Sequence, residues 1–211
     1  MKQYHKIQSV FKRDPATKHK TMLYGVFTLP EFEFLKNNPW VWTEKVDGTN
    51  IRLMWNGTSV EIGGKTDNAQ IPAPLIQWLN EHIHYDNFTA AFGAEGGVCV
   101  YGEGYGGKIQ KAGDTYGDPQ RFVVFDVKVG DWWLRREDVE GVAAQLGLDI
   151  VPVIGVGSLV DMVSYTAKGF DSSWGPFTAE GIVARPEAEL RSRRGDRLIT
   201  KIKHTDFRQK L

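Results

Sequence analysis

The stretch WVWTEKVDGTNIRLMW, residues 40–55, contains two apolar runs separated by a short polar turn. Both runs are rich in Trp, Val, Ile and Thr, which favour strands, and the Asp-Gly pair between them favours a turn. Lys45 therefore lies between a strand and a glycine turn. We expect a lysine in that position to be exposed at the head of a pocket, where its neutral amine can attack an electrophilic phosphorus.

Further strand-like runs, bounded by glycine, proline or charged turns, lie on the C-terminal side of this stretch. They are SVEIG at 59–63, VCVYG at 98–102, RFVVFDV at 121–127, GIVARP at 181–186 and RLITKIK at 197–203. Three segments carry helix signals: proline opens 72–83, glycine closes 135–147, and serine and glycine flank 158–169. Strands at this density, joined mostly by tight turns, predict an α+β fold of antiparallel sheets with helices on their outer faces.

The composition is that of a soluble globular protein, which we expect to form one domain over residues 1–211. Hydrophobic residues make up 41% and charged residues 25%, and no apolar run approaches the roughly 18 residues needed to cross a bilayer. Cys99 is the single cysteine and cannot form an internal disulfide. The first ten residues lack the apolar core of a secretory signal. We therefore expect a cytoplasmic, reducing location and no membrane partner.

The formal net charge of zero averages over segments of opposite sign. Residues 1–20 contain six Lys or Arg and one acid, and residues 185–211 contain nine and four, whereas residues 21–184 contain 11 and 21. Basic ends around an acidic centre suit a protein that binds phosphates with its ends and a metal with its central carboxylates. An ordinary solvated surface would show the same pattern.

Two other patterns imitate functional motifs. The stretch YGEGYGGKIQ at 101–110 has the GxGxxG spacing, but Ile109 follows its lysine where a P-loop needs Ser or Thr, and no predicted helix follows as a dinucleotide-binding fingerprint requires. His82 and His84 end a predicted helix with no third ligand at a metal-site spacing, so we expect surface histidines.

Lys201 and Lys203, at i and i+2 in RLITKIK, point to one face of a predicted strand. Two ammonium groups on one face disfavour a third positive charge, so they favour the neutral amine of Lys45, and they can also bind a triphosphate. An exposed edge strand whose lysines prevent aggregation would have the same sequence.

Two glutamates lie next to predicted strand ends. Glu103 follows the strand at 98–102, and Glu180 precedes the strand at 181–186. Magnesium is usually held by one or two such carboxylates together with substrate phosphates. Each acid taken alone is as consistent with a solvated side chain.

In this order the blocks resemble the motifs of the covalent nucleotidyltransferases, the superfamily of ATP-dependent ligases and mRNA capping enzymes. The resemblance is most specific to the type-two RNA ligases of bacteriophages and RNA-editing systems, and it runs from about residue 40 to about residue 204. EKVDGTN resembles the first motif, with Lys45 as nucleophile, and VEIGGKT resembles the next, with Lys65 where the family commonly has arginine. Four further stretches resemble the later motifs: YGEGYGGKIQ with Glu103, RFVVFDV with Phe125 and Asp126, FTAEGIVARP with Glu180, and RLITKIK with Lys201 and Lys203.

The resemblance implies an α+β nucleotidyltransferase (ATP-grasp-like ligase) fold, in which two antiparallel sheets flanked by helices hold the nucleotide between them. It implies ATP as cofactor, with AMP carried covalently on Lys45, and Mg²⁺ or Mn²⁺ held by Glu180 and Glu103. The nucleotide-binding roles implied are Glu44 for the adenine amino group, Phe125 for stacking on adenine, Glu103 for the ribose, Lys201 and Lys203 for the phosphates, and further contacts from Asn50, Arg52 and Lys65.

Three of these assignments have open points. Phe125 stands in an apolar strand, so core packing is the alternative, and it is compatible with one exposed ring face. Arg52, seven residues after Lys45, contacts phosphate or lies on the surface. Lys65 offers a point charge where arginine would grip a phosphate bidentately, which predicts weaker binding of an RNA end.

The implied activity is ATP-dependent RNA ligation by a monomer in a bacterial or phage-infected cell, acting on nicked or single-stranded RNA ends. The alternatives are a DNA ligase or capping enzyme, which share the lysine motif, and a non-catalytic RNA-end-binding module. DNA ligases and capping enzymes normally add an OB-fold after the fifth motif, and eight residues follow Lys203 here. A binding module would not need Lys45, Glu180 and the KIK lysines, all of which are present.

Type-two RNA ligases usually carry a further helical domain after the fifth motif, and we expect neither it nor an OB-fold here. RNA contact is then expected to come from the basic ends, or from a partner protein that presents the RNA. The C-terminal residues expected in this role are Arg191, Arg193, Arg194 and Arg197.

Overall fold

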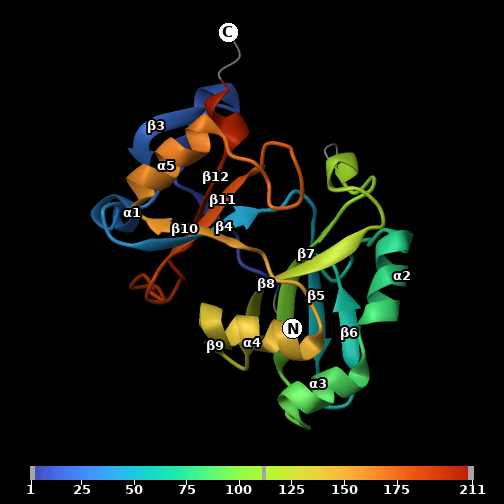
Figure 1. Ribbon diagram of the computed structural model, residues 1–211. Coiled ribbons are helices and arrows are strands. Elements are labelled where there is room, and N and C mark those ends of the chain that lie inside the picture. Colours follow the sequence, from blue (N-terminus) through green and yellow to red (C-terminus); the bar gives the residue numbers. More distant parts are fainter. Residues whose placement is uncertain (1–2, 111–112, 209–211) are drawn as a thin grey trace. The chain divides into compact units, whose positions relative to one another are not determined.

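The computed structural model of the chain, which describes residues 3–110 and 113–208, divides into two compact units (Figure 1). Unit 1 comprises residues 1–5 and 47–151, and unit 2 comprises residues 6–46 and 152–211. The chain passes from unit 2 into unit 1 after Val46 and returns after Val151. Each unit has its own sheet, its own helices and its own hydrophobic core.

The sheet of unit 1 has five strands in the order β6-β5-β7-β8-β9, and every neighbouring pair is antiparallel. The strands are β5 (Thr49–Trp55), β6 (Val60–Gly63), β7 (Val98–Tyr105), β8 (Arg121–Val129) and β9 (Trp132–Trp133). The three central strands are rich in Val, Ile and aromatic residues, which pack well on a pleated surface.

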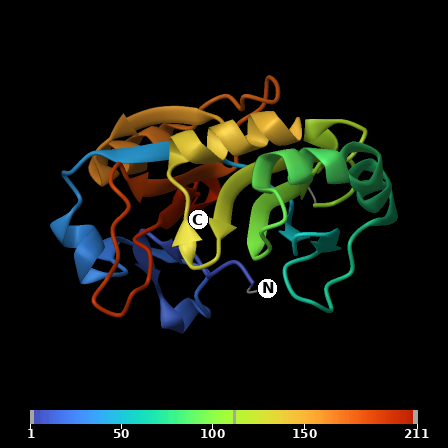
Figure 2. The same ribbon diagram turned by 90° about the horizontal axis from the view of Figure 1, so that it is seen from below.

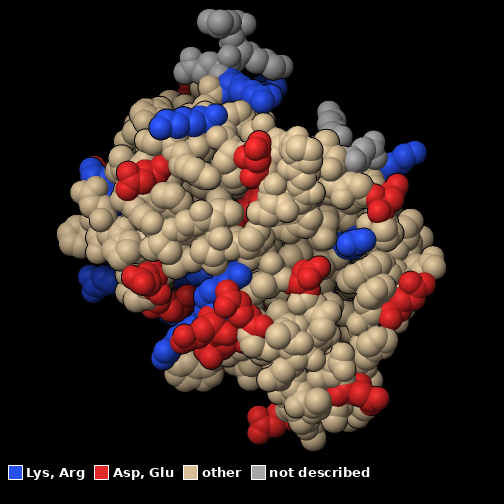
Figure 3. Space-filling view, viewed as in Figure 1, with Lys and Arg blue, Asp and Glu red and all other residues tan. Residues whose placement is uncertain are grey.

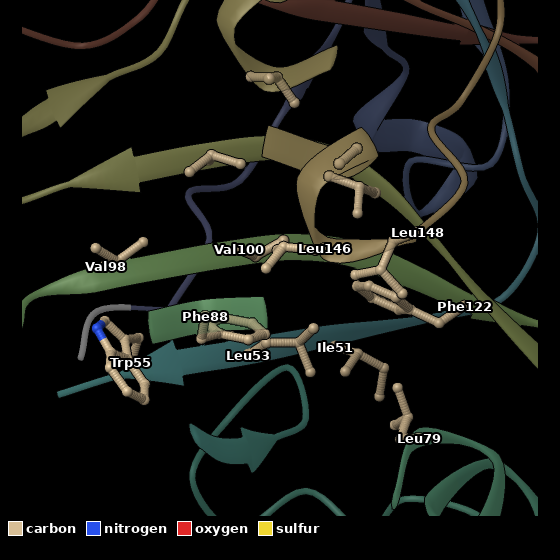
Figure 4. Close-up of a cluster of buried hydrophobic side chains, with 14 of the residues drawn as sticks. Ile51, Leu53, Trp55, Leu79, Phe88, Val98, Val100, Phe122, Leu146 and Leu148 are labelled. Carbon is tan, nitrogen blue, oxygen red and sulfur yellow. The ribbon is translucent and has the colours of Figure 1, made fainter. Parts of the chain in front are cut away.

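Helices cover one face of this sheet (Figure 2). They are α2 (Ala73–His82), α3 (Tyr85–Phe92) and α4 (Arg136–Leu146), and a 3-10 helix, η2 (Gly113–Tyr116), also belongs to unit 1. Leu79, Phe88 and Leu146 of the helices join Ile51 and Leu53 of β5 in one buried cluster (Figure 4). Burial of a side chain of this size contributes about 1.5–3 kcal/mol, so this cluster holds the helices to the sheet.

The opposite face of the same sheet carries polar residues of the predicted motifs beside a small apolar cluster that includes Met54 and Tyr101. Successive side chains of a strand point to opposite faces, and Ile51 and Leu53 point into the core. Asn50 and Arg52 therefore point away from it. Across the β5–β7 pair, Asn50 is opposite Glu103. Several residues of the predicted motifs thus share one face of unit 1.

Strand β7 contains two glycines at positions where its neighbours leave no room for a side chain. A Cβ at Gly102 would lie 2.3 Å from the ring of Phe122, and a Cβ at Gly104 would lie 2.3 Å from Leu75. The glycines allow close packing and do not make a turn. The prediction that Glu103 follows the strand is therefore wrong in this detail, because Glu103 lies inside β7.

Unit 2 contains a five-stranded sheet in the order β1-β12-β11-β4-β10 and a separate two-stranded sheet, β2-β3. The strands are β1 (Gln8–Ser9), β2 (Phe11–Arg13), β3 (Met22–Phe27), β4 (Trp40–Lys45), β10 (Val153–Gly157), β11 (Gly181–Pro186) and β12 (Thr200–Lys203). The pairs are antiparallel except β1 and β12, which run parallel. Parallel strands need a long connection, and β1 and β12 can pair in this way because no tight turn joins them.

Two α-helices, α1 (Pro30–Phe34) and α5 (Leu159–Lys168), and two 3-10 helices, η1 (Pro15–Thr17) and η3 (His204–Phe207), complete unit 2. Helix α5 begins at a capping box in which the Ser158 hydroxyl accepts a hydrogen bond from the backbone N–H of Asp161. Its buried Leu159 and Met162 pack with Trp40 and Ile182 in the core of the unit.

All seven predicted strands and all three predicted helices are present, which confirms the α+β fold with antiparallel sheets. The predicted strand at 197–203 forms only over its last four residues, as β12. The strands and α-helices not predicted are β1, β2, β3, β9, β10, α1 and α3, and the 3-10 helices η1, η2 and η3 were not predicted either. Within residues 3–110 and 113–208, no helix has both the length and the apolarity to span a bilayer.

Candidate active site

Two of the predicted lysines are aligned where three neighbouring strands of the unit 2 sheet end or begin. Gly181 of β11 is opposite Lys45 of β4 on one side and opposite Lys203 of β12 on the other. Residues paired across neighbouring strands point to the same face, so both lysine side chains leave the sheet on one face. The sequence separation of Lys45 and Lys203 is large, and the strand register alone brings them together.

The carboxylate of Glu180 lies between these two amines. Nζ of Lys45 is 2.5 Å from Oε2, and Nζ of Lys203 is 2.6 Å from Oε1. The side chain of Glu180 is 12% exposed and that of Lys45 is 18% exposed, so water screens the Lys45 pair only partly. Each carboxylate oxygen of Glu180 thus lies within hydrogen-bond distance of one lysine amine.

Gly181 is required at the centre of this row by close backbone contact. A Cβ there would lie 2.1 Å from the carbonyl oxygen of Ile202 and 2.7 Å from Cα of Lys203. Real Cβ atoms do not approach other atoms this closely. The absence of a side chain at Gly181 therefore lets β11 and β12 approach closely beside Lys45.

Lys201 lies on the same face as Lys203. The burial of Thr200 and Ile202 alternates with the partial exposure of the two lysines, as expected for a strand with one buried face. The prediction that the two lysines share a face is confirmed. Lys201 is opposite Val183 of β11 and Ser9 of β1, so β12 is an inner strand, which rules out the alternative that these lysines guard a sheet edge.

Glu44 points to the other face of β4 and is 1% exposed. Its Oε1 accepts a hydrogen bond of 2.6 Å from the Ser172 hydroxyl, and its Oε2 accepts one of 2.8 Å from the backbone N–H of Ser173. The Ser172 oxygen in turn accepts from the N–H of Trp174. Glu44 therefore fixes the segment that follows α5 to the strand that carries Lys45.

In unit 1, Asn50 and Glu103 form a cross-strand pair on the polar face. Oδ1 of Asn50 is buried and has no hydrogen-bond partner among the described residues. Buried polar atoms are nearly always hydrogen-bonded in native proteins, so this oxygen is a candidate for a ligand's donor group. A ribose hydroxyl is a donor of the right kind.

Phe125 is an extra residue in its strand. Gly102 pairs with Val124 and Tyr101 pairs with Asp126, so the β7–β8 register skips Phe125 and forms a β-bulge. Its ring is partly buried and meets Tyr4 edge to face, with 4.9 Å between ring centroids. Phe125 combines core packing with partial exposure, as the two readings of its sequence allowed.

Arg52 is fully buried, so the expectation of a surface position is wrong. Its Nε donates to the carbonyl oxygen of Gly64 at 2.8 Å, and its Nη2 lies 2.7 Å from Oδ1 of Asp67. The hydrogen bond from Arg52 holds the pKa of the exposed Asp67 carboxyl below its ordinary value. Arg52 thereby ties the segment after β6, which carries the exposed Lys65, to the middle of the sheet.

The two predicted metal ligands belong to different units, Glu103 to unit 1 and Glu180 to unit 2. In the described part of the chain, His, Cys, Asp and Glu residues do not gather in groups of three or more that could hold an ion. A single carboxylate such as Glu180 suits magnesium, which takes its other ligands from water and substrate phosphates.

Several supporting residues could not be identified from the sequence. Ser172 is 128 residues from Glu44 and Asp67 is 15 residues from Arg52, and neither belongs to a recognisable motif. Gly181 had a weak signal, because it follows the candidate Glu180 and opens a strand.

Solved structures with the same fold include RNA ligase structures from Naegleria gruberi. A variant with ATP and Mn has a TM-score of 0.69 at 14% identity over 98% of this chain and 57% of that chain. The enzyme with PPi gives 0.68 at 15% identity over 97% and 58%, and a variant with AMP and Mn gives 0.66 at 14% over 97% and 58%. The likeness identifies a nucleotidyltransferase-type fold, and this chain spans less than three-fifths of the length of those chains.

A sequence model of the family described as RNA ligase matches residues 38–203. Because the match covers most of the chain, this protein belongs to the RNA ligase family. The matched segment includes all six predicted motif blocks. No curated protein sequence matches the chain significantly.

Proposed function

We propose that this protein joins RNA ends by an ATP-dependent reaction that passes through AMP bound covalently to Lys45. The observation that carries the proposal is the row of Lys45, Glu180 and Lys203, which places a nucleophilic amine beside a carboxylate and a second cation. Family membership supports the substrate class. The Naegleria relatives with ATP, AMP and PPi support the nucleotide, and those with Mn support a divalent metal.

In the proposed first step, Nζ of Lys45 attacks the α-phosphorus of ATP. A nitrogen–phosphorus bond forms, the bond from the α-phosphorus to its bridging oxygen breaks, and pyrophosphate leaves. The amine must first lose its proton, and Oε2 of Glu180 is a proton acceptor 2.5 Å away. Lys203 and Lys201 favour the neutral amine through their positive charge and bind the phosphates.

Metal binding fits the same carboxylate. Once Lys45 has given its proton to Glu180 and that proton has passed to solvent, the ion pair is lost and one carboxylate oxygen can accept another cation before the transfer. We propose Glu180 and Glu103 each as a ligand for Mg²⁺ or Mn²⁺, and such an ion would neutralise charge on phosphate oxygens during transfer.

The remaining contacts with ATP are proposed as follows. Asn50 and Glu103 bind the ribose hydroxyls, for which the Asn50 oxygen offers an unused acceptor. Phe125 stacks on the adenine with the exposed part of its ring, as aromatic faces stack on bases. Glu44 accepts from the adenine amino group with a lone pair not used by its serine partners. Lys65 contacts phosphate, and Arg52 holds the segment that carries Lys65 through its bonds to Gly64 and Asp67.

In the later steps AMP passes to the 5′-phosphate of an RNA end, and a 3′-hydroxyl then displaces AMP and closes the phosphodiester. We propose that residues 1–211 act in this as one nucleotidyltransferase domain and as a monomer in the cytoplasm, on nicked or single-stranded RNA. Positioning and charge stabilisation supply most of the rate enhancement in such phosphoryl transfers.

The test compares the wild type with Lys45→Ala on two RNA substrates. The variant cannot form the lysyl adduct, so it should fail on ends that carry a 5′-phosphate. It should still seal RNA that already carries AMP at its 5′ end, because that step does not use the lysine as nucleophile. The wild type should use ATP and reject GTP. Sealing of 5′-phosphate ends by Lys45→Ala, or efficient labelling by GTP, would refute the proposal.

A further inference from the structure

Unit 2 contains a small basic hairpin that no step above uses. Residues 11–27, the basic hairpin, consist of β2, β3 and the connection between them. Lys12, Lys18, His19 and Lys20 are exposed on it. Asp14 is the one acid of the hairpin, and its side chain is used inside the turn, where it accepts from the N–H of Ala16 at 2.8 Å.

The turn of the hairpin holds its basic residues in a fixed and unusual conformation. Lys18 and His19 have φ angles of 54° and 60°, in the left-handed region that non-glycine residues rarely adopt. Hydrogen bonds within the turn hold them there. The N–H of His19 donates to the carbonyl oxygen of Asp14 at 2.9 Å, and the N–H of Thr21 donates to Oγ1 of Thr17 at 3.0 Å. The three consecutive basic side chains 18–20 are therefore displayed on an ordered loop.

An exposed aromatic ring stands on the same hairpin. Tyr24 is 67% exposed. Its ring contacts Phe11 and Phe207, with centroid distances of 5.3 Å and 6.4 Å, so the ring is oriented while most of its surface faces solvent. The hairpin thus carries an exposed, supported aromatic ring as well as exposed cations, and this combination binds single-stranded nucleic acids, with rings stacking on bases and cations on phosphates.

The hairpin is anchored to the strand that carries the catalytic lysines. Arg13 of β2 lies 2.6 Å from Oδ1 of Asp206. Oδ2 of the same carboxylate accepts the backbone N–H of Lys203 at 3.0 Å. A single buried carboxylate thus connects the hairpin to the residue whose side chain meets Glu180. A strand bound on the hairpin would start close to the phosphate-binding end of β12.

The C-terminal arginines expected to bind RNA divide into two kinds. Arg197 is 8% exposed, and its Nε lies 2.5 Å from Oε1 of Glu189, so the expectation that it contacts RNA is not supported by its position. Arg191, Arg193 and Arg194 are exposed. On the face shown in Figure 3, Lys and Arg side chains alternate with Asp and Glu side chains and do not merge into one basic surface. RNA binding should therefore depend on the local arrangement of basic side chains more than on the total charge of this face.

We propose that the basic hairpin binds the single-stranded, 5′-phosphate-bearing strand of the RNA substrate and leads its end toward Lys203. Lys18 and Lys20 contact backbone phosphates, and Tyr24 stacks on a base. This inference rests on the proposed RNA ligase function and assigns its RNA-binding surface.

The experiment measures binding of a short fluorescent RNA with a 5′-phosphate, by anisotropy, over a range of salt. The charge variant is Lys18→Asn with Lys20→Gln, because asparagine tolerates the left-handed conformation. The matched control is Arg121→Gln with Arg135→Gln, which removes two exposed charges from unit 1. Tyr24→Ala tests stacking, and Tyr24→Phe should restore it.

If two phosphate contacts are lost, the salt slope should become shallower by about 1.4, at roughly 0.7 per contact for single strands. Between about 50 and about 200 mM salt the wild type should then lose about sevenfold more affinity than the charge variant. Tyr24→Ala should bind about tenfold more weakly and Tyr24→Phe like the wild type. The salt slope of the control should differ from that of the wild type by less than half of the change expected for the charge variant.

Adduct formation with ATP separates failure of this inference from failure of the proposed function, because that step uses no RNA. If the wild type forms no AMP adduct, the function is wrong. If adducts form normally but the hairpin variants bind RNA with wild-type affinity and slope, the hairpin is not the RNA surface. Equal sensitivity of polyglutamate binding to the same variants would also overturn the proposal, since it would show a non-specific anion surface.

Discussion

Replacing Gly181 by alanine should disable AMP transfer by displacing the row of Lys45, Glu180 and Lys203. The added Cβ would lie 2.1 Å from the carbonyl oxygen of Ile202, and ordinary contact begins at 3.4 Å. The atom that it meets belongs to the backbone, so no side-chain rotation relieves the clash. β11 and β12 must therefore separate by about 1.3 Å at this point.

That separation acts directly on the reacting groups, because Gly181 is paired with both Lys45 and Lys203. A misplacement of about 1 Å costs an oriented site about 100-fold in rate. Overpacking of this kind costs about 1–3 kcal/mol of folding free energy. We expect the single-turnover rate of AMP transfer to Lys45 to fall about 100-fold, in a protein that still folds.

The assay is rapid-quench adduct formation followed by intact mass, with urea unfolding to measure stability. Gly141→Ala in α4 is the control, since a Cβ there meets nothing within 4 Å. Alanine in place of a helical glycine should stabilise the protein by about 0.5–1 kcal/mol and leave the rate unchanged. A wild-type rate for Gly181→Ala would refute the reasoning that strand register positions the nucleophile.

Three further predictions concern charge. Lys203→Met should slow AMP transfer most at neutral pH, and the rate should recover partly as pH rises, because a neighbouring cation favours the neutral amine of Lys45. A uniform loss of rate at every pH would restrict Lys203 to phosphate binding. Glu180→Gln should raise the Mg²⁺ concentration needed for half-maximal transfer, and an unchanged titration would remove Glu180 from metal binding. Burial raises the pKa of the Cys99 thiol from 9.0 to about 11, so the thiol ionises first in the unfolded chain, and the free energy of unfolding should fall as pH rises from about 9 to about 11. Urea unfolding of Cys99→Ala across this pH range should show a smaller fall. Equal pH dependence of the two proteins would contradict the effect.

The strands that the sequence predicted are those with a high density of β-branched and aromatic residues, such as 121–127. Strand β10 was missed because its glycines argue against a strand. The structure explains them: a Cβ at Gly155 would lie 2.9 Å from the ring of Trp42, and one at Gly157 would lie 2.8 Å from it. Helix α3 was missed because it is short and has no side-chain cap.

The motif residues could be predicted because their chemistry is written in local patterns, whereas the contacts that hold them could not. The pairing of Lys45 with Lys203 depends on a register over three strands, set by packing of the whole sheet. The partners of Glu44 come from a segment 128 residues away. Arg52 was expected at phosphate or on the surface, and its burial follows from its place in a central strand.

The central claim is that Lys45 is the nucleophile, and the most direct measurement is the mass of the protein after incubation with ATP and magnesium. The mass should rise by one AMP, and peptide mapping should place it on the segment that contains Lys45. The adduct should be stable to alkali and labile to acid, as a nitrogen–phosphorus bond is. A Lys45→Ala protein that still gains AMP, or an adduct on any other residue, would contradict the account.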